Sequence, residues 1–240
     1  MQSVVLLHGF SGTHRAFDAV VASLDRERYR PLALDLPGHG AAGRVRPITF
    51  DSCTAAVLDA APARFDLCGY SMGGRIALHV ALAARERVRR LVLVSTSAGI
   101  EDAAERARRR ETDRALADRL EGEPLEDFVA RWRTQPLFAD DPPRVDALAR
   151  EDQRRNRPQD LAEVLRGVGA GEMAPLWRRL GELTMPAVVV AGERDKRYVA
   201  LGRRMAAALA HGEPEVIAGG HNLALENPQG VAAALVRRSP

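Results

Sequence analysis

Six short and largely apolar runs are distributed along this chain, each followed by a turn that contains glycine or polar residues. The runs are Val4–Leu7, Pro31–Leu36, Phe65–Gly69, Leu91–Ser95, Ala187–Ala191 and Glu215–Ile217. Runs of this length without polar alternation are typical of parallel strands that are buried on both faces. Because stretches with helical periodicity separate them, the pattern predicts an α/β fold with a mostly parallel sheet of about six strands, flanked by helices.

The alternation of strand and helix signals is interrupted between about residues 99 and 184. This stretch shows only helical periodicity, as in Ala103–Leu120, which ends at Gly122 before Pro124, and in Leu125–Arg133. Ligands of open α/β sheets bind at the carboxyl ends of the strands, so a helical block inserted between two strands is expected to cover those ends as a cap. We interpret residues 1–240 as a single domain that carries this helical cap.

The composition argues against several function classes. No run of eighteen apolar residues occurs, so no membrane span is predicted, and the N-terminus lacks the pattern of a signal peptide. Cys53 and Cys68 have no metal-ligand spacing, and a reduced, cytoplasmic setting is expected. The net charge of +3 is carried by arginines interleaved with acidic residues, which does not favour a nucleic-acid partner. No metal set, dinucleotide fingerprint or phosphate loop is visible, so neither metal nor cofactor is predicted.

One segment carries a specific chemical signal. Gly69-Tyr70-Ser71-Met72-Gly73 has the pattern G-x-S-x-G, directly after an apolar run and before the expected helix Gly74–Ala84. This strand–turn–helix context is the one in which the α/β-hydrolase fold exposes a reactive serine on a sharp turn. An ordinary glycine-rich turn between strand and helix is the alternative interpretation.

A serine hydroxyl becomes reactive only when a neighbouring base draws on its proton, and a carboxylate must orient that base. In this fold the acid and the histidine follow the serine in that order along the chain. Asp195 follows the apolar run Ala187–Ala191, and His221 follows the last run. The sequence therefore predicts a Ser71–His221–Asp195 triad, with Glu193 as an alternative acid.

Such a site also needs backbone N–H groups that face developing negative charge, an arrangement called an oxyanion hole. One donor is expected to be the N–H of Met72, the residue after the serine. The other is expected in the loop after the first strand, at Phe10.

Several further segments resemble those of the 2-succinyl-6-hydroxy-2,4-cyclohexadiene-1-carboxylate synthase family, the lyases of menaquinone biosynthesis. The nucleophile turn continues into Gly74-Arg75, as it does in that family. The other similar segments are His8-Gly9-Phe10-Ser11-Gly12, Asp35-Leu36-Pro37-Gly38-His39-Gly40, Trp132 with Gln135-Pro136-Leu137-Phe138, Gly192-Glu193-Arg194-Asp195-Lys196, and Gly220-His221-Asn222 with Glu226-Asn227-Pro228. The resemblance covers nearly the whole chain.

The resemblance implies a reaction without hydrolysis. Pyruvate would be eliminated from 2-succinyl-5-enolpyruvyl-6-hydroxy-3-cyclohexene-1-carboxylate, with Ser71, activated by His221 and Asp195, as the base that removes a carbon-bound proton. The partner would be this small polycarboxylate. The substrate-binding residues that the resemblance implies are Arg75, Arg109, Arg154 in preference to Arg155, Tyr70 and Trp132.

The residue types agree with such a substrate. Arginine forks bind carboxylates through two hydrogen bonds, and Arg75 lies one helical turn beyond Ser71 on the same predicted helix face. Two positions depart from the family pattern. Ala224 stands where the family usually has a further histidine, and the first predicted strand lies almost at the start of the chain, without the N-terminal hairpin common in this fold.

Two other functions are compatible with the same residues. A carboxylesterase or C–C bond hydrolase for a small acidic substrate would use Ser71 as a nucleophile and form an acyl-enzyme. A non-catalytic binding protein on the same scaffold is less favoured, because all three triad residue types are present. The oligomeric state stays open between monomer and dimer.

Overall fold

The computed structural model describes residues 1–237, and it contains all six predicted strands. They are β1 (Gln2–Leu7), β2 (Tyr29–Leu34), β3 (Phe65–Tyr70), β4 (Val88–Val94), β5 (Ala187–Gly192) and β6 (Gly212–Ile217). Within the described residues these strands form one sheet in the order β2-β1-β3-β4-β5-β6, and every neighbouring pair is parallel. The chain moves outward from β1 to β2 and then back past β1 to β3. Ligand sites of open sheets lie at such a reversal, outside the carboxyl ends of the strands.

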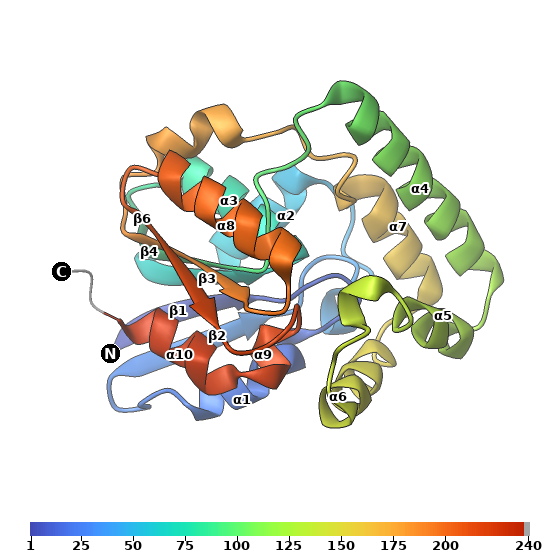
Figure 1. The fold of residues 1–240 in the computed structure, drawn as a ribbon, viewed down its shortest axis with the longest axis horizontal. Coiled ribbons are helices and arrows are strands. Elements are labelled where there is room, and N and C mark those ends of the chain that lie inside the picture. Colours follow the sequence, from blue (N-terminus) through green and yellow to red (C-terminus); the bar gives the residue numbers. More distant parts are fainter. Residues whose placement is uncertain (238–240) are drawn as a thin grey trace.

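Helices cover both faces of the sheet. One face carries α2 (Phe50–Ala60), α3 (Met72–Ala83) and α8 (Lys196–Ala208), and the other carries α1 (Asp18–Ala22), α9 (Leu223–Glu226) and α10 (Pro228–Val236) (Figure 1). Alternate residues of β1 pack into the two layers: Val5 and Leu7 into the first, Val4 and Leu6 into the second. Both faces of β1 are therefore buried, which explains why its sequence is continuously apolar.

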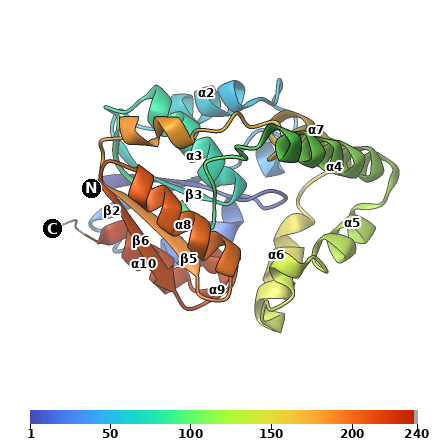
Figure 2. The same cartoon turned by 45° about the horizontal axis from the view of Figure 1, so that its top comes forward.

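Four helices lie between β4 and β5 in the chain, in the stretch where the sequence predicted a cap. They are α4 (Ala103–Gly122), α5 (Leu125–Trp132), α6 (Pro143–Gln153) and α7 (Pro158–Val168), with the 3-10 turns η3 (Pro136–Phe138) and η4 (Trp177–Glu182). All four stand to one side of the sheet (Figures 1 and 2). Leu120, Phe128 and Leu161, from three of these helices, belong to a separate buried apolar cluster. The cap therefore has a small core of its own.

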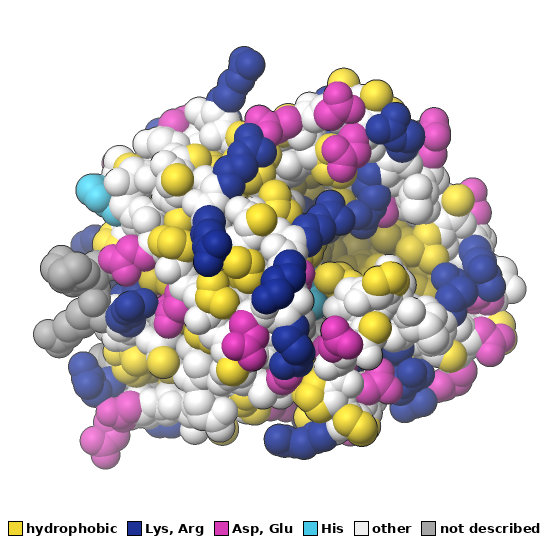
Figure 3. Space-filling view, viewed as in Figure 1, with side chains coloured by type: hydrophobic (Ala, Val, Ile, Leu, Met, Phe, Trp, Pro, Cys, Tyr) yellow, Lys and Arg dark blue, Asp and Glu magenta, His cyan; other side chains and the backbone are white. Residues whose placement is uncertain are grey.

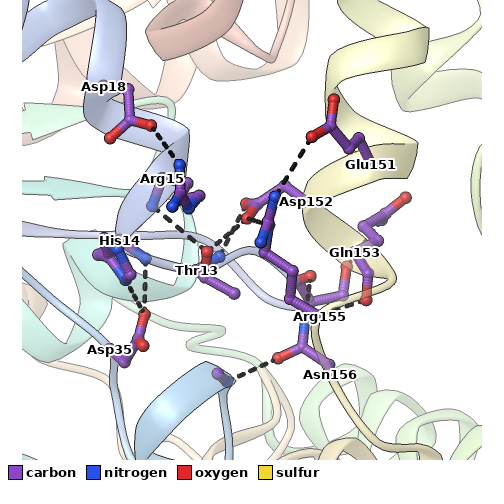
Figure 4. A network of polar contacts seen from close by, with 12 residues as sticks. Thr13, His14, Arg15, Asp18, Asp35, Glu151, Asp152, Gln153, Arg155 and Asn156 are labelled. Carbon is purple, nitrogen blue, oxygen red and sulfur yellow. Dashed lines mark hydrogen bonds and ion pairs between the residues drawn. The ribbon is translucent and has the colours of Figure 1, made fainter.

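The end of α6 is bonded to the loop that follows β1. Asp152 accepts hydrogen bonds from the backbone N–H of Thr13, at 2.8 Å, and from the Thr13 hydroxyl (Figure 4). Asn156 donates to the carbonyl oxygen of Ser11 at 2.7 Å, and Gln153 donates to the Ser11 hydroxyl at 2.8 Å. These contacts fix the cap to the loop that carries Phe10. Among residues 1–237, none of the helices is long and apolar enough to span a membrane.

Candidate active site

Ser71 lies on a sharp turn between the end of β3 and the start of α3. Its backbone angles are φ 52° and ψ −111°, a combination that residues other than glycine rarely adopt. A Cβ atom at Gly73 would lie 2.2 Å from the carbonyl oxygen of Leu7, and one at Gly69 would lie 2.4 Å from the carbonyl oxygen of Gly73. The two glycines of the motif are therefore required, because the helix, the turn and β1 approach one another without room for side chains.

The structure brings Ser71, His221 and Asp195 together. The Nδ1 atom of His221 is 2.7 Å from a carboxylate oxygen of Asp195, and its Nε2 atom is 3.2 Å from the Ser71 hydroxyl. His221 and Asp195 are buried. Because the carboxylate can only accept, it holds the proton on Nδ1 and leaves Nε2 free to accept the hydroxyl proton of Ser71. Glu193, the alternative acid, is exposed.

The two expected oxyanion donors line the same cavity as Ser71. Met72 is the first residue of α3, so its N–H has no partner within the helix. Within residues 1–237, the backbone N–H groups of Phe10 and Met72 donate to no protein acceptor. Both donors are therefore available to a ligand.

Two buried histidines support the loop that carries Phe10. The Nε2 atom of His39 accepts from the backbone N–H of Ser11 at 3.2 Å, and the Nε2 atom of His8 accepts from the N–H of Leu36 at 3.0 Å. Burial lowers the pKa of His8 and lowers the pKa of His39 well below its ordinary value. Both rings are thus held neutral, as these acceptor roles require. Neither histidine was predicted to have a role in the site.

A cavity of about 510 Å³ opens between the cap and the carboxyl ends of the strands. Figure 3 shows a hollow beside the cap, with hydrophobic side chains in its depth and Lys or Arg side chains at its rim. The predicted site residues that line the cavity are Ser71, Asp195, His221, Phe10, Met72, Arg75, Arg109 and Trp132. Its volume suits a small-molecule ligand.

Arg75 and Arg109 supply positive charge to this cavity. Arg75 is partly buried, and within the described part of the chain its buried Nη1 atom has no hydrogen-bond partner. Burial lowers the pKa of its guanidinium to about 10, so the group is still charged at neutral pH. Arg109 is 2.8 Å from the carboxylate of Asp113 and keeps 42% of its side chain exposed. A partly buried cation whose Nη1 atom is buried and has no protein partner is the arrangement expected where a ligand anion binds.

Arg154 does not reach the cavity, contrary to the sequence expectation. It caps the C-terminus of α6 and pairs with Glu126 at 2.8 Å on the surface, and Arg155 pairs with Glu151. The buried positions at this end of the helix are taken by Asp152 and Gln153. The side chain of Arg154 is therefore directed outward.

Tyr70 lines a second, smaller cavity and not the large one. This cavity, of about 60 Å³, is also lined by Ser71, Phe10 and Trp132, and by Ala224, where the family usually has a histidine. The Tyr70 hydroxyl donates to Asn222 at 2.6 Å, and burial raises its pKa well above the ordinary value. The hydroxyl therefore already has a protein partner, while the ring lies beside the reactive serine.

Among the cavity-lining residues that were not predicted from the sequence are Arg194, Arg197 and Tyr198. The Tyr198 ring is 4.7 Å from the ring of His221, and its backbone N–H donates to Asp195 at 3.3 Å. Arg194 pairs with Glu226. Arg197 and Tyr198 lie in the first turn of α8, which begins directly after Asp195. Among residues 1–237, no group of histidine, cysteine and acidic side chains is arranged to hold a metal ion.

A sequence model of the Alpha/beta hydrolase family matches residues 4–234. The chain thus belongs to the α/β hydrolases, as the fold and the serine turn indicate.

The chain is 33% identical over 242 residues to 2-succinyl-6-hydroxy-2,4-cyclohexadiene-1-carboxylate synthase of Klebsiella pneumoniae (strain 342), with 98% of this chain and 92% of that protein covered. The synthase of Escherichia coli O1:K1 / APEC is 32% identical over 246 residues, with the same coverage of 98% and 92%. The structure of MenH from S. aureus matches with a TM-score of 0.88 and 31% identity over 97% of this chain and 91% of that one. Within the α/β hydrolases, the chain belongs to the 2-succinyl-6-hydroxy-2,4-cyclohexadiene-1-carboxylate synthase family, which confirms the sequence resemblance.

Proposed function

We propose that this chain eliminates pyruvate from 2-succinyl-5-enolpyruvyl-6-hydroxy-3-cyclohexene-1-carboxylate, with Ser71 as the base. Its synthase relatives carry the name of the product of this reaction. The observation that carries the proposal is Arg75, a cation without a protein partner in a cavity that also holds the Ser71 hydroxyl. A substrate with several carboxylates supplies the anion that this site lacks.

The first step is removal of a carbon-bound proton. His221 accepts the hydroxyl proton of Ser71 through Nε2 while the Ser71 oxygen takes the proton from the substrate carbon. Asp195 stabilises the imidazolium through Nδ1. The negative charge that develops on the substrate is held by the N–H groups of Phe10 and Met72.

The second step breaks the bond between the ring carbon and the enolpyruvyl oxygen. The electron pair of the former C–H bond becomes the new ring double bond, and pyruvate leaves as its enolate. One proton passes from the substrate carbon to the Ser71–His221 pair in the first step, and one proton converts the enolate to pyruvate afterwards. The reaction as a whole therefore consumes no proton. Arg75 and Arg109 hold the carboxylates in place throughout, and neither step needs a water molecule.

The test is release of pyruvate from this substrate, followed with lactate dehydrogenase and NADH. Ser71→Ala should abolish turnover while leaving the cavity and its arginines in place. As a matched control, Ser23→Ala changes an exposed serine of the surface and should have no effect. Turnover that survives Ser71→Ala would contradict the proposal.

The hydrolase alternative uses the same contact of 3.2 Å between His221 and Ser71, but with Ser71 as nucleophile. It predicts a burst of product from a chromogenic acetyl ester and an acyl group on Ser71 that mass spectrometry detects. The lyase proposal predicts no covalent substrate intermediate. We further propose that residues 1–240 act as a single domain in the cytoplasm.

A further inference from the structure

Tyr198 brings a phenolic group to the large cavity from the sheet side of the site. It lies in the first turn of α8, three residues after Asp195, which is the N-cap residue of that helix. Helical side chains point back toward the N-terminus of their helix, which directs Tyr198 toward the carboxyl ends of the strands. Its side chain is partly buried and lines the same cavity as Ser71 and Arg75.

The ring and the backbone of Tyr198 are both in contact with the triad. The ring lies 4.7 Å from the imidazole of His221, at an angle of 54°, and the backbone N–H donates to the carboxylate of Asp195 at 3.3 Å. Among residues 1–237 the Tyr198 hydroxyl donates to no protein acceptor, whereas the hydroxyl of Tyr70 donates to Asn222. Phenylalanine would make both triad contacts equally well. The fold therefore does not explain the hydroxyl.

The Tyr198 hydroxyl and the Arg75 guanidinium approach the same part of the cavity. Burial lowers the pKa of Arg75 to about 10, and of the two groups that raise it again Tyr198 acts more strongly than Asp113. Arg75 comes from α3 and Tyr198 from α8, two helices on one face of the sheet (Figure 1). The buried Nη1 atom of Arg75 has no protein partner among residues 1–237. Two hydrogen-bond donors from separate helices are thus available to one ligand.

We propose that the Tyr198 hydroxyl donates a hydrogen bond to the same substrate carboxylate that Arg75 binds. The two oxygens of a carboxylate accept several hydrogen bonds, so one carboxylate can take both donors. Because the Tyr198 ring packs on His221, this bond fixes the position of the carboxylate relative to the imidazole. The choice of substrate rests on the proposed function, whereas the shared anion site rests on Arg75 and Tyr198 alone.

The test compares Tyr198→Phe with the wild type, because this change removes the hydroxyl and keeps the ring and the backbone N–H. Tyr29→Phe is the matched control, since it removes the hydroxyl of a tyrosine at the start of β2, which does not line the cavity. Three quantities are measured: kcat/KM for pyruvate release, the rate at which a fluorophosphonate labels Ser71, and the succinate concentration that halves this rate. Succinate is a dicarboxylate like the succinyl arm of the proposed substrate, and its binding needs no turnover.

Tyr198→Phe should separate binding of the anion from reactivity of the serine. Loss of a hydrogen bond to a charged group should lower kcat/KM by about 10- to 100-fold and raise the half-protecting succinate concentration by about tenfold or more. Labelling of Ser71 without succinate should stay within about twofold of the wild-type rate, because the ring still packs on His221. Tyr29→Phe should match the wild type in all three measurements.

A double-variant comparison tests whether the two donors share one carboxylate. Effects of residues that contact the same group are not additive. In the Arg75→Met background the carboxylate is no longer held in place, so Tyr198→Phe should lower kcat/KM by less than about threefold. An undiminished loss in that background would show that Tyr198 and Arg75 act on different parts of the substrate, and the proposal would be wrong.

Two other results would also overturn the inference. One is a Tyr198→Phe variant with kcat/KM and succinate protection within twofold of the wild type, which would leave Tyr198 as a wall of the cavity only. The other is a wild type that succinate does not protect from labelling. A wild type that succinate protects but that releases no pyruvate would contradict the proposed function instead, and the succinate protection of Tyr198→Phe would still decide the role of the hydroxyl.

Discussion

Replacement of Arg75 by methionine should weaken catalysis and strengthen the fold at the same time. Methionine has a similar length and flexibility but no charge, so it fills much of the same space. The guanidinium of Arg75 has no protein partner among residues 1–237, and its Nη1 atom is buried. Any favourable interaction of the buried Nη1 atom must therefore be made with a ligand.

The size of each effect follows from the burial and the missing partner. A pKa of about 10 corresponds to a penalty on the order of 3 kcal/mol for the charged form, since one pKa unit is ~1.4 kcal/mol. Residual contact with water reduces this, so Arg75→Met should raise the free energy of unfolding by about 1–2 kcal/mol. Loss of a two-point contact with a carboxylate should cost about 3 kcal/mol in the transition state, or about 100-fold in kcat/KM.

Arg133→Met is the matched comparison. Arg133 is buried, and unlike Arg75 it is paired with two carboxylates, those of Asp141 and Asp146. Its removal leaves a buried carboxylate without its cation, which should lower the free energy of unfolding by about 3–5 kcal/mol. Urea unfolding followed by tryptophan fluorescence gives the stabilities, and pyruvate release gives kcat/KM. If Arg75→Met were destabilised like Arg133→Met and kept its kcat/KM, the ligand role of Arg75 would be refuted.

Three further changes test other parts of the structure. Asp195→Asn should lower kcat by about 10³–10⁴-fold, because the amide no longer holds the imidazole in the required tautomer; a loss below tenfold in the pyruvate assay would exclude that role. Gly73→Ala places a Cβ atom 2.2 Å from a β1 carbonyl oxygen and should destabilise the fold by about 3 kcal/mol or more, whereas Gly122→Ala, with open space around it, should leave the melting temperature unchanged or higher. His8 and His39 have lowered pKa values in the fold, so the unfolded chain binds more protons than the folded chain as the pH falls. The free energy of unfolding should therefore have its full value above pH ~6.5 and fall by about 1–2 kcal/mol per pH unit below it. His39→Gln, which keeps a donor and an acceptor, should reduce that slope in urea unfolding at pH 7 to 5, and an unchanged slope would show that His39 does not titrate on unfolding.

The sheet was predictable because its signal is local. Interior strands buried on both faces have continuous apolar sequences, and the run at β5 begins where the strand does. The first residues of a strand were not predicted where the strand contains polar residues. β4 begins at Val88, before Arg89 and Arg90, and Arg89 is accommodated by an ion pair of 3.2 Å with Asp66. β6 begins at Gly212, before the apolar residues that were recognised as a strand. Its side chains are only partly buried or exposed, as an edge strand allows, so its first residues give no apolar signal.

The expectation that Ser71, Asp195 and His221 meet followed from chain order, because each residue comes directly after a strand of one sheet. The cap side of the site was not predictable in this way. Its residues depend on how each cap helix is rotated about its axis, and the sequence of α6 does not distinguish the outward Arg154 from the inward Asp152 and Gln153. The ion pair of Arg133 with Asp141 was missed for the same reason, since surface and buried arginines have the same local sequence pattern.

The bonds between α6 and the loop after β1 have a consequence for engineering. Caps are attractive units to exchange between α/β hydrolases, because they select the substrate while the sheet holds the triad. Here Asp152 and Asn156 hold Thr13 and Ser11, next to the N–H of Phe10. A chimera with a foreign cap would leave that loop without its supports, so a productive transplant has to exchange residues 10–13 together with the helices.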